Sequence, residues 1–282
     1  MTCFCSFWNP TPRSERLKIH YFPATNATGE HPPLLFVHGG FSHSLYWTIY
    51  FIPFFQQQGY ECYALDLSGH GDSSGREFLD RFGVDDFVDD LAYAVNTIGK
   101  ETVIISHSMG SLITQRLLGR GVKTVKGAVF IAPIPASGTG ASAVRLAFNS
   151  PDFFTELEHL IQGRTLSDRA LDIMARTYFS PHTDRTDILK TLPMIQPESV
   201  RAVTEMVSLP LPLFEQRPAI PVLFLAGTED AVFPSIIMSF NAMNWKQSKV
   251  VEIKGAGHMV MLDVQWQEAA TAIQDWLDTA GF

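Results

Sequence analysis

A serine flanked by small residues, where an apolar run gives way to a helical pattern, constrains the fold of this chain most strongly. The apolar run TVII (residues 102–105) is followed by SHSMG (106–110), and a helical pattern begins at residue 111. A strand that turns this sharply into a helix strains the backbone of its central residue and leaves space only for small residues two positions before and after it. The pattern therefore predicts an exposed hydroxyl at the turn, with Ser108 at its apex.

Apolar runs of this kind recur along the chain and alternate with helical patterns. The predicted strands are 16–22, 33–37, 60–66, 102–106, 126–132, 222–226 and 249–253. The predicted helices between them are 45–57, 85–98, 111–118, 235–244 and 264–279. Runs such as residues 222–225 contain only apolar residues, as is typical of parallel strands covered by helices on both faces. The predicted fold is α/β, a doubly wound and mostly parallel sheet, and its ligands are expected at the carboxyl ends of the strands.

The alternation of strands and helices stops in the second half of the chain. Helical patterns at 152–161, 168–178 and 198–207 follow one another without an evident strand, and prolines bracket them. We therefore predict a core domain of residues 1–133 and 218–282 and an inserted helical segment of residues 134–217. Its apolar side chains, including Phe148, Phe153 and Met174, would face either the interior of the insert or a substrate pocket.

Two later strand ends carry the partners that a nucleophilic serine needs. The strand 222–226 is followed by GTED, which contains Glu229 and Asp230, and the strand 249–253 is followed by a glycine-rich loop with His258. A serine hydroxyl is a poor nucleophile until an imidazole takes its proton, and a carboxylate fixes the tautomer of that imidazole. Ser108, Asp230 and His258 are the predicted catalytic residues, with Glu229 as the alternative acid.

Acyl transfer also needs backbone donors for an oxyanion. One is the N–H of Met109, at the start of the helix that follows Ser108. The second is expected from the loop HGGF (residues 38–41), where Gly40 is the first choice and Phe41 the alternative, because the register of the loop is open. Phe41 and His107 are also candidates for the substrate pocket.

The chain resembles the α/β-hydrolase-fold serine hydrolases, in particular the cap-bearing group of esterases, lipases and C–C hydrolases. The matching segments are HGG (38–40) with Trp47 downstream, DLSGHGDS (66–73), the turn at Ser108, GTED (227–230) and GAGH (255–258). Serine precedes aspartate and histidine, which is the order of this family. Ser106 and Ser68 depart from the pattern, because the family usually has glycine and a basic residue there. The resemblance implies that residues 134–217 form a helical cap, or lid, over the site.

The resemblance further implies hydrolysis of carboxylic esters with apolar acyl or aromatic groups through an acyl-enzyme on Ser108, with no metal and no organic cofactor. The same triad serves C–C bond hydrolases, acyltransferases and perhydrolases, and these alternatives stay open. A non-catalytic ligand receptor on the same fold is a further alternative, although a broken triad would be expected there. Five arginines of the insert could bind a substrate carboxylate or be solvated at the surface: Arg145, Arg164, Arg169, Arg176 and Arg185.

Charge and cysteine content limit the partners. The net charge of −8 argues against nucleic acid, whose binding depends on Lys and Arg contacts to phosphate. Three cysteines, Cys3, Cys5 and Cys62, are too few for a disulfide framework and favour a reducing compartment. The chain has neither the features of a secretory signal near its start nor an apolar run of about 18 residues for a membrane span. We expect a cytoplasmic protein that acts on a small apolar molecule, and its oligomeric state is open.

Overall fold

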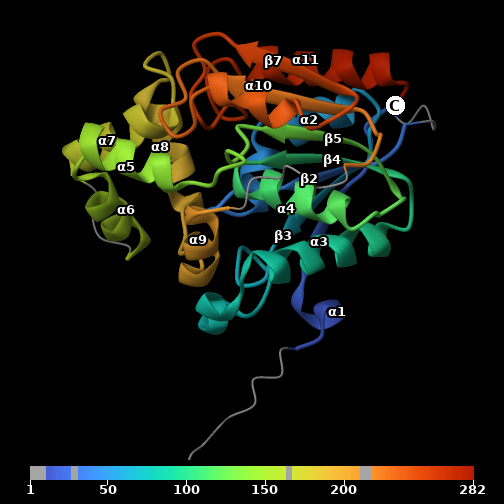
Figure 1. Ribbon diagram of the computed structural model, residues 1–282, viewed down its shortest axis with the longest axis horizontal. Helices are drawn as coiled ribbons and strands as arrows, with labels where there is room; N and C mark the ends of the chain where they lie inside the picture. The colour runs from blue at the N-terminus through green and yellow to red at the C-terminus, as the bar shows by residue number, and fades with distance from the viewer. Residues whose placement is uncertain (1–10, 27–30, 163–166, 210–216) are drawn as a thin grey trace, which may run out of the picture.

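Seven strands form one sheet in the computed structural model, which describes residues 11–26, 31–162, 167–209 and 217–282 (Figure 1). Their spatial order is β1-β3-β2-β4-β5-β6-β7, and only β1 is antiparallel to its neighbour. The predicted α/β class with a mostly parallel sheet is confirmed. Cys3, Cys5 and Arg164 lie outside the described residues. The strands are β1 Lys18–Phe22, β2 Leu34–Val37, β3 Cys62–Asp66, β4 Thr102–His107, β5 Val125–Ile131, β6 Val222–Gly227 and β7 Ser248–Ile253.

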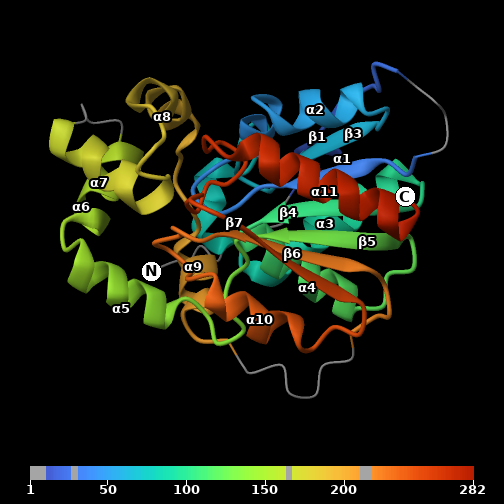
Figure 2. The ribbon, with the colours of Figure 1, turned by 90° about the horizontal axis from the view of Figure 1, so that it is seen from above.

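Helices cover both faces of the sheet (Figure 2). On one face lie α2 (Phe51–Gln57) and α11 (Trp266–Ala280). On the other lie α3 (Val84–Ile98), α4 (Met109–Gly119) and α10 (Ile236–Ala242). In β2, Leu34 and Phe36 pack with the first pair of helices, whereas Leu35 and Val37 pack with the second group. Every residue of β2 is therefore buried, which explains why such strands show no polar alternation.

The predicted helix 45–57 is divided in the structure. A short 3-10 helix, η1 (Ser44–Thr48), is followed by α2, which begins at Phe51. Pro53 lies in the first turn of α2, where the missing N–H of proline has no intrahelical partner to lose. The remaining short helices of the core are α1 (Arg13–Arg16) and η2 (Arg76–Arg81).

In the described residues between β5 and β6, five α-helices and one short 3-10 helix form a group that we call the insert helices. They gather at one end of the sheet (Figure 1). Three begin at a serine or aspartate whose side chain accepts a backbone N–H of the first turn, as Ser199 does from Ala202. No helix in the described ranges has the length and apolarity needed to cross a bilayer. They are α5 Gly140–Asn149, α6 Phe153–Ile161, α7 Asp168–Tyr178, α8 Arg185–Thr191, η3 Leu192–Met194 and α9 Val200–Val207.

A buried carboxylate explains how the chain accommodates serine at position 68. Asp90 of α3 is fully buried and accepts hydrogen bonds from the Ser68 amide at 3.0 Å and the Ser68 hydroxyl at 2.5 Å. Its other oxygen contacts Arg13 Nε at 2.8 Å and Arg16 Nη2 at 3.4 Å. The positive charge beside Asp90 therefore comes from α1, and Ser68 supplies only neutral donors.

Candidate active site

The turn between β4 and α4 presents one of its two serines. Ser108 has φ 49° and ψ −115°, a strained conformation for a residue with a side chain, and it is partly exposed. Ser106 is fully buried in β4, and its hydroxyl donates to the Val129 carbonyl at 3.0 Å. Ser106 can replace the usual glycine because the neighbouring strand satisfies its hydroxyl. Only Ser108 is accessible to a reactant.

Two glycines let the loop after β2 (residues 38–42, the β2 loop) pass directly over this turn. A Cβ at Gly110 would lie 2.5 Å from the His38 carbonyl oxygen. A Cβ at Gly39 would lie 2.7 Å from His107 Nδ1 and 3.1 Å from the Cβ of Ser108. Real Cβ atoms do not approach other atoms this closely, so both positions require glycine. The β2 loop is thereby packed against the candidate nucleophile.

The predicted acid and base meet at the carboxyl edge of the sheet. His258 Nδ1 lies 2.8 Å from Asp230 Oδ2, and both side chains are buried. The other Asp230 oxygen accepts the N–H groups of Val232 and Phe233, each at 2.7 Å. Glu229, the alternative acid, is exposed. Because a carboxylate accepts hydrogen bonds, Nδ1 of His258 carries the proton and Nε2 is left as the basic nitrogen.

His107 connects the turn to the His258 loop and to the β2 loop. Its Nε2 lies 3.2 Å from the His258 carbonyl, and its Nδ1 lies 3.4 Å from the Tyr46 hydroxyl. Tyr46 in turn accepts the Gly39 N–H at 3.0 Å. Burial, together with the nearby His258, lowers the pKa of His107 well below its ordinary value, so the ring is neutral. His107 therefore donates from Nε2 and accepts at Nδ1, and it serves as a buried link that does not line the pocket.

The two candidate donors of the β2 loop differ in their partners. The Phe41 N–H donates to Glu198 Oε2 at 3.2 Å, whereas the Gly40 N–H has no acceptor among the described residues. Met109 is the first residue of α4, where a backbone N–H has no intrahelical acceptor. Ser108 Oγ likewise has no hydrogen-bond partner in the part of the chain that is described. The rings of His107 and His258 are 4.8 Å apart, which brings the turn close to the base.

A mostly apolar pocket opens beside this site. Its cavity measures about 60 Å³, and Phe41, a candidate pocket residue, is one of its walls. Phe153 and Met174 are buried in an apolar cluster of the insert helices that also contacts Phe41. Phe148 lies on α5 with 84% of its surface exposed, so it does not line the pocket, contrary to the prediction. Other walls are Tyr46, Leu157, Tyr178, Met194 and Met259.

The insert contacts the loops that carry the acid and the base. Arg145 Nη2 donates to the carbonyls of Ala231 and Val232, at 2.7 and 2.6 Å, directly after Asp230. The Met259 N–H, directly after His258, donates to the Tyr178 carbonyl at 2.8 Å. Since both contacts use backbone groups next to catalytic candidates, the insert helps to fix these loops.

Four of the five arginines named above lie in described residues, and each contacts a group of the protein. Arg145 is held by the carbonyls just described, and Arg169 pairs with Asp152. Arg185 pairs with two aspartates of α7, and Arg176 donates to the carbonyl of Asp172. The walls of the apolar pocket include none of these four described arginines, so the pocket offers no guanidinium for a substrate carboxylate.

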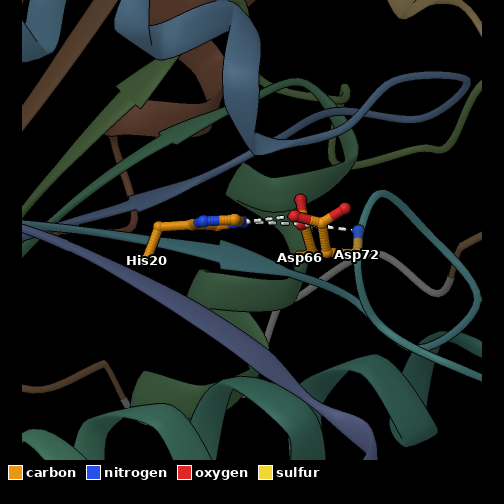
Figure 3. A group of neighbouring side chains, drawn as sticks. All are labelled: His20, Asp66 and Asp72. Carbon is orange, nitrogen blue, oxygen red and sulfur yellow. Dashed lines mark hydrogen bonds and ion pairs between the residues drawn. The ribbon is translucent and has the colours of Figure 1, made fainter.

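A separate group of potential metal ligands lies on β1, at the end of β3 and in the loop that follows β3. His20 Nε2 is 2.9 Å from Asp66 Oδ2 and 3.7 Å from Asp72 Oδ2 (Figure 3). Both oxygens of Asp66 already accept backbone N–H groups, from Ser44 at 2.8 Å and from Asp72 at 2.9 Å. The carboxylate therefore anchors the loops after β2 and β3, which accounts for its burial without a cation.

Comparisons with known proteins agree with this architecture. The family model described as the alpha/beta hydrolase fold matches residues 32–264. No curated protein sequence matches the chain. A putative non-heme bromoperoxidase, BpoC from Mycobacterium tuberculosis, superposes with a TM-score of 0.73 at 20% identity, over 94% of this chain and 97% of that one. An esterase from Exiguobacterium antarcticum gives 0.74 at 13% identity, over 93% and 95%. A monoacylglycerol lipase from Paleococcus ferrophilus gives 0.69 at 22% identity, over 94% and 99%.

Proposed function

The chain belongs to the alpha/beta hydrolase fold family, and we propose that within this family it is a serine hydrolase that cleaves carboxylic esters. The observation that carries the proposal is the 2.8 Å contact between Asp230 and His258, beside the strained and partly exposed Ser108. The three residues follow the carboxyl ends of β4, β6 and β7 in the parallel part of the sheet, where ligands of open α/β sheets bind.

In the proposed reaction, Ser108 Oγ attacks the ester carbonyl while Nε2 of His258 takes its proton. The imidazolium that forms is stabilised by Asp230, and it returns the proton to the leaving alcohol. A water molecule then attacks the acyl-enzyme, again with His258 as general base, and releases the carboxylic acid. The two backbone bonds to the other oxygen of Asp230 keep the carboxylate in place throughout.

We propose Gly40 and Met109 as the donors to the oxyanion. The Phe41 N–H is engaged by Glu198, which favours Gly40 over the alternative in this loop. Met109 lies at the positive end of α4, which favours negative charge. Each such donor contributes roughly 10²- to 10³-fold in kcat.

The apolar pocket favours substrates with a short and uncharged acyl group. The cavity of about 60 Å³ is small and mostly apolar, which favours a short acyl chain. We expect p-nitrophenyl butyrate to react faster than the decanoate. Leu157→Ala removes part of one wall and should move the preference towards longer chains. An unchanged preference would exclude this pocket as the acyl site.

The nucleophile is tested by paired serine variants. Ser108→Ala should abolish both turnover of p-nitrophenyl butyrate and labelling by a fluorophosphonate probe, because the attacking oxygen is removed. Ser106→Ala is the matched control, since it removes a hydroxyl two residues away without touching the reactant. Labelling that persists in the Ser108 variant would overturn the assignment.

We propose the inserted segment 134–217 as the cap over the site. Because the same triad can transfer the acyl group to water or to another acceptor, the acceptor has to be measured. A substrate panel of acyl esters, vinylogous diketones, and esters with added alcohol or peroxide separates hydrolysis from C–C cleavage, acyl transfer and perhydrolysis. Tight binding of esters without turnover of any would instead indicate a receptor.

A further inference from the structure

The chain segment before α9 holds both backbone polar groups of Phe41 in the β2 loop. Glu198 Oε2 accepts the Phe41 N–H at 3.2 Å, and the Gln196 N–H donates to the Phe41 carbonyl at 3.0 Å. The Gln196 side chain also donates from Nε2 to the Ser42 carbonyl at 2.5 Å. Phe41 has φ 58°, a region that residues with side chains adopt only when their surroundings fix them. These three contacts supply that constraint.

Glu198 is suited to this task because its charge is balanced inside the protein. Its carboxylate is fully buried, and Oε2 lies 3.2 Å from Nε2 of the equally buried His70. Burial alone would lower the pKa of His70, but the charge and hydrogen bond of Glu198 raise it above its ordinary value. Burial alone would raise the pKa of Glu198, but His70 holds it below its ordinary value. When His70 is protonated, the two groups form an ion pair that balances the negative charge of Glu198 next to a forming oxyanion.

Gly40 lies between two residues that are each fixed. Gly39 is packed on His107 and Ser108, and Phe41 is held by Glu198. A Cβ at Gly40 would itself lie 3.3 Å from Glu198 Oε2, so the carboxylate borders the residue that carries the proposed donor. Glu198 holds the Gly40–Phe41 peptide through the Phe41 N–H, and a movement of that peptide would shift Gly40 and redirect its N–H.

We propose that Glu198 is a positioning residue for the oxyanion hole, acting through the Phe41 N–H to aim the Gly40 N–H at the substrate. The proposal rests on the ester hydrolysis proposed above. It assigns the inserted segment a part in transition-state stabilisation that is separate from its contacts with substrate.

Two substitutions separate the reach of the side chain from its charge. Glu198→Asp keeps the carboxylate but shortens the side chain by one methylene, which withdraws the acceptor from Phe41. A misplacement of about 1 Å can cost about 100-fold in rate, so we expect kcat of this variant to fall about 100-fold with KM nearly unchanged. Glu198→Gln keeps the reach and an acceptor oxygen but loses the charge, and its kcat should fall by less than about 10-fold. The second-order rate of fluorophosphonate labelling should follow the same order, because the phosphonyl oxygen occupies the same hole.

Glu205 provides the matched control. It lies on α9, and it also accepts a backbone N–H of the core, that of Val84 at 2.8 Å, far along the chain from the β2 loop. Glu205→Asp and Glu205→Gln should leave kcat unchanged. Thermal unfolding of all four variants checks that each is folded at the assay temperature.

Each outcome is decisive for one claim. Full activity of Glu198→Asp, or a larger loss in Glu198→Gln than in Glu198→Asp, would overturn the positioning role while leaving Ser108 in place. Labelling and turnover that survive Ser108→Ala would instead overturn the proposed function, and the positioning role with it.

Discussion

Replacing Tyr46 with phenylalanine tests the link between the two loops and the nucleophile turn. The Tyr46 hydroxyl accepts the Gly39 N–H at 3.0 Å and faces His107 Nδ1 at 3.4 Å, and all three groups are buried. The phenylalanine ring fills the same space, so the substitution removes only the contacts of the hydroxyl, which are these two and one to the Ser42 side chain. Gly39 directly precedes the proposed oxyanion donor, so the substitution should reduce both stability and catalysis.

The size of the effect follows from the burial of these groups. A buried N–H without an acceptor costs about 1–3 kcal/mol, and the lost bond to His107 adds about 0.5–1.5 kcal/mol. We expect a total loss of about 1.5–4.5 kcal/mol in the free energy of unfolding. For a chain of 282 residues that corresponds to a fall in Tm of roughly 3–8 °C. A β2 loop freed on one side should lower kcat about 10-fold, since a small displacement of a donor is costly.

Urea denaturation and p-nitrophenyl butyrate kinetics measure the two effects separately. Tyr60→Phe is the control, because its hydroxyl contacts the Phe282 carbonyl at 3.3 Å and Gln274 at 3.4 Å, near the amino-terminal end of β3. That variant should lose stability but retain kcat. An equal loss of kcat in both tyrosine variants, or a loss below about 1 kcal/mol in Tyr46→Phe, would refute the reasoning.

Three other substitutions test features away from the nucleophile. Asp90→Asn leaves Arg16 buried beside a neutral group and should cost about 3–5 kcal/mol in urea denaturation; a loss below about 1 kcal/mol would contradict the ion pair. The His70–Glu198 pair should contribute fully between pH 4.5 and 6.5, the ordinary pKa values of its two groups. Because the pKa of His70 is raised on folding, this contribution is lost as pH rises through the folded value. The difference in unfolding free energy between wild type and Glu198→Gln should therefore shrink from pH 6 to pH 9, and a constant difference would refute the pairing. Phe148→Ser should change acyl-chain preference and stability by no more than about 0.5 kcal/mol, because this side chain is 84% exposed; a shifted preference would return Phe148 to the pocket.

The parts of this structure that could be predicted from the sequence depend on local signals. The strands are apolar because both faces of the sheet are covered, so their runs stand out, and parallel strands place their carboxyl ends at one edge. That is why residues as distant as Asp230 and His258 could be expected to meet there. The turn at Ser108 could also be predicted from a local signal, because its steric limits on side-chain size act within five consecutive residues.

What could not be predicted depends on packing between distant segments. Glu198 precedes a helix, and Tyr46 lies in a helical pattern. Surface residues of both types are common at such positions, so nothing in the sequence indicates that these two are buried. Their burial follows only from how the insert helices meet the β2 loop. Phe148 shows the converse, because an aromatic side chain in an amphipathic pattern does not reveal which face of a short helix meets a neighbour.

The insert touches the backbone beside the proposed oxyanion donor, acid and base: Phe41 through Glu198, Ala231 through Arg145, and Met259 through the Tyr178 carbonyl. Chimeras in which this region is exchanged with that of a relative should consequently fail as catalysts even where they fold. They should retain activity only if the exchanged region also provides these three contacts. In laboratory evolution, changes of acyl preference should accumulate first on pocket walls such as Leu157, whereas the tethering positions should resist substitution. Different residues of the inserted segment are thus expected to control the acyl-chain specificity and the catalytic rate.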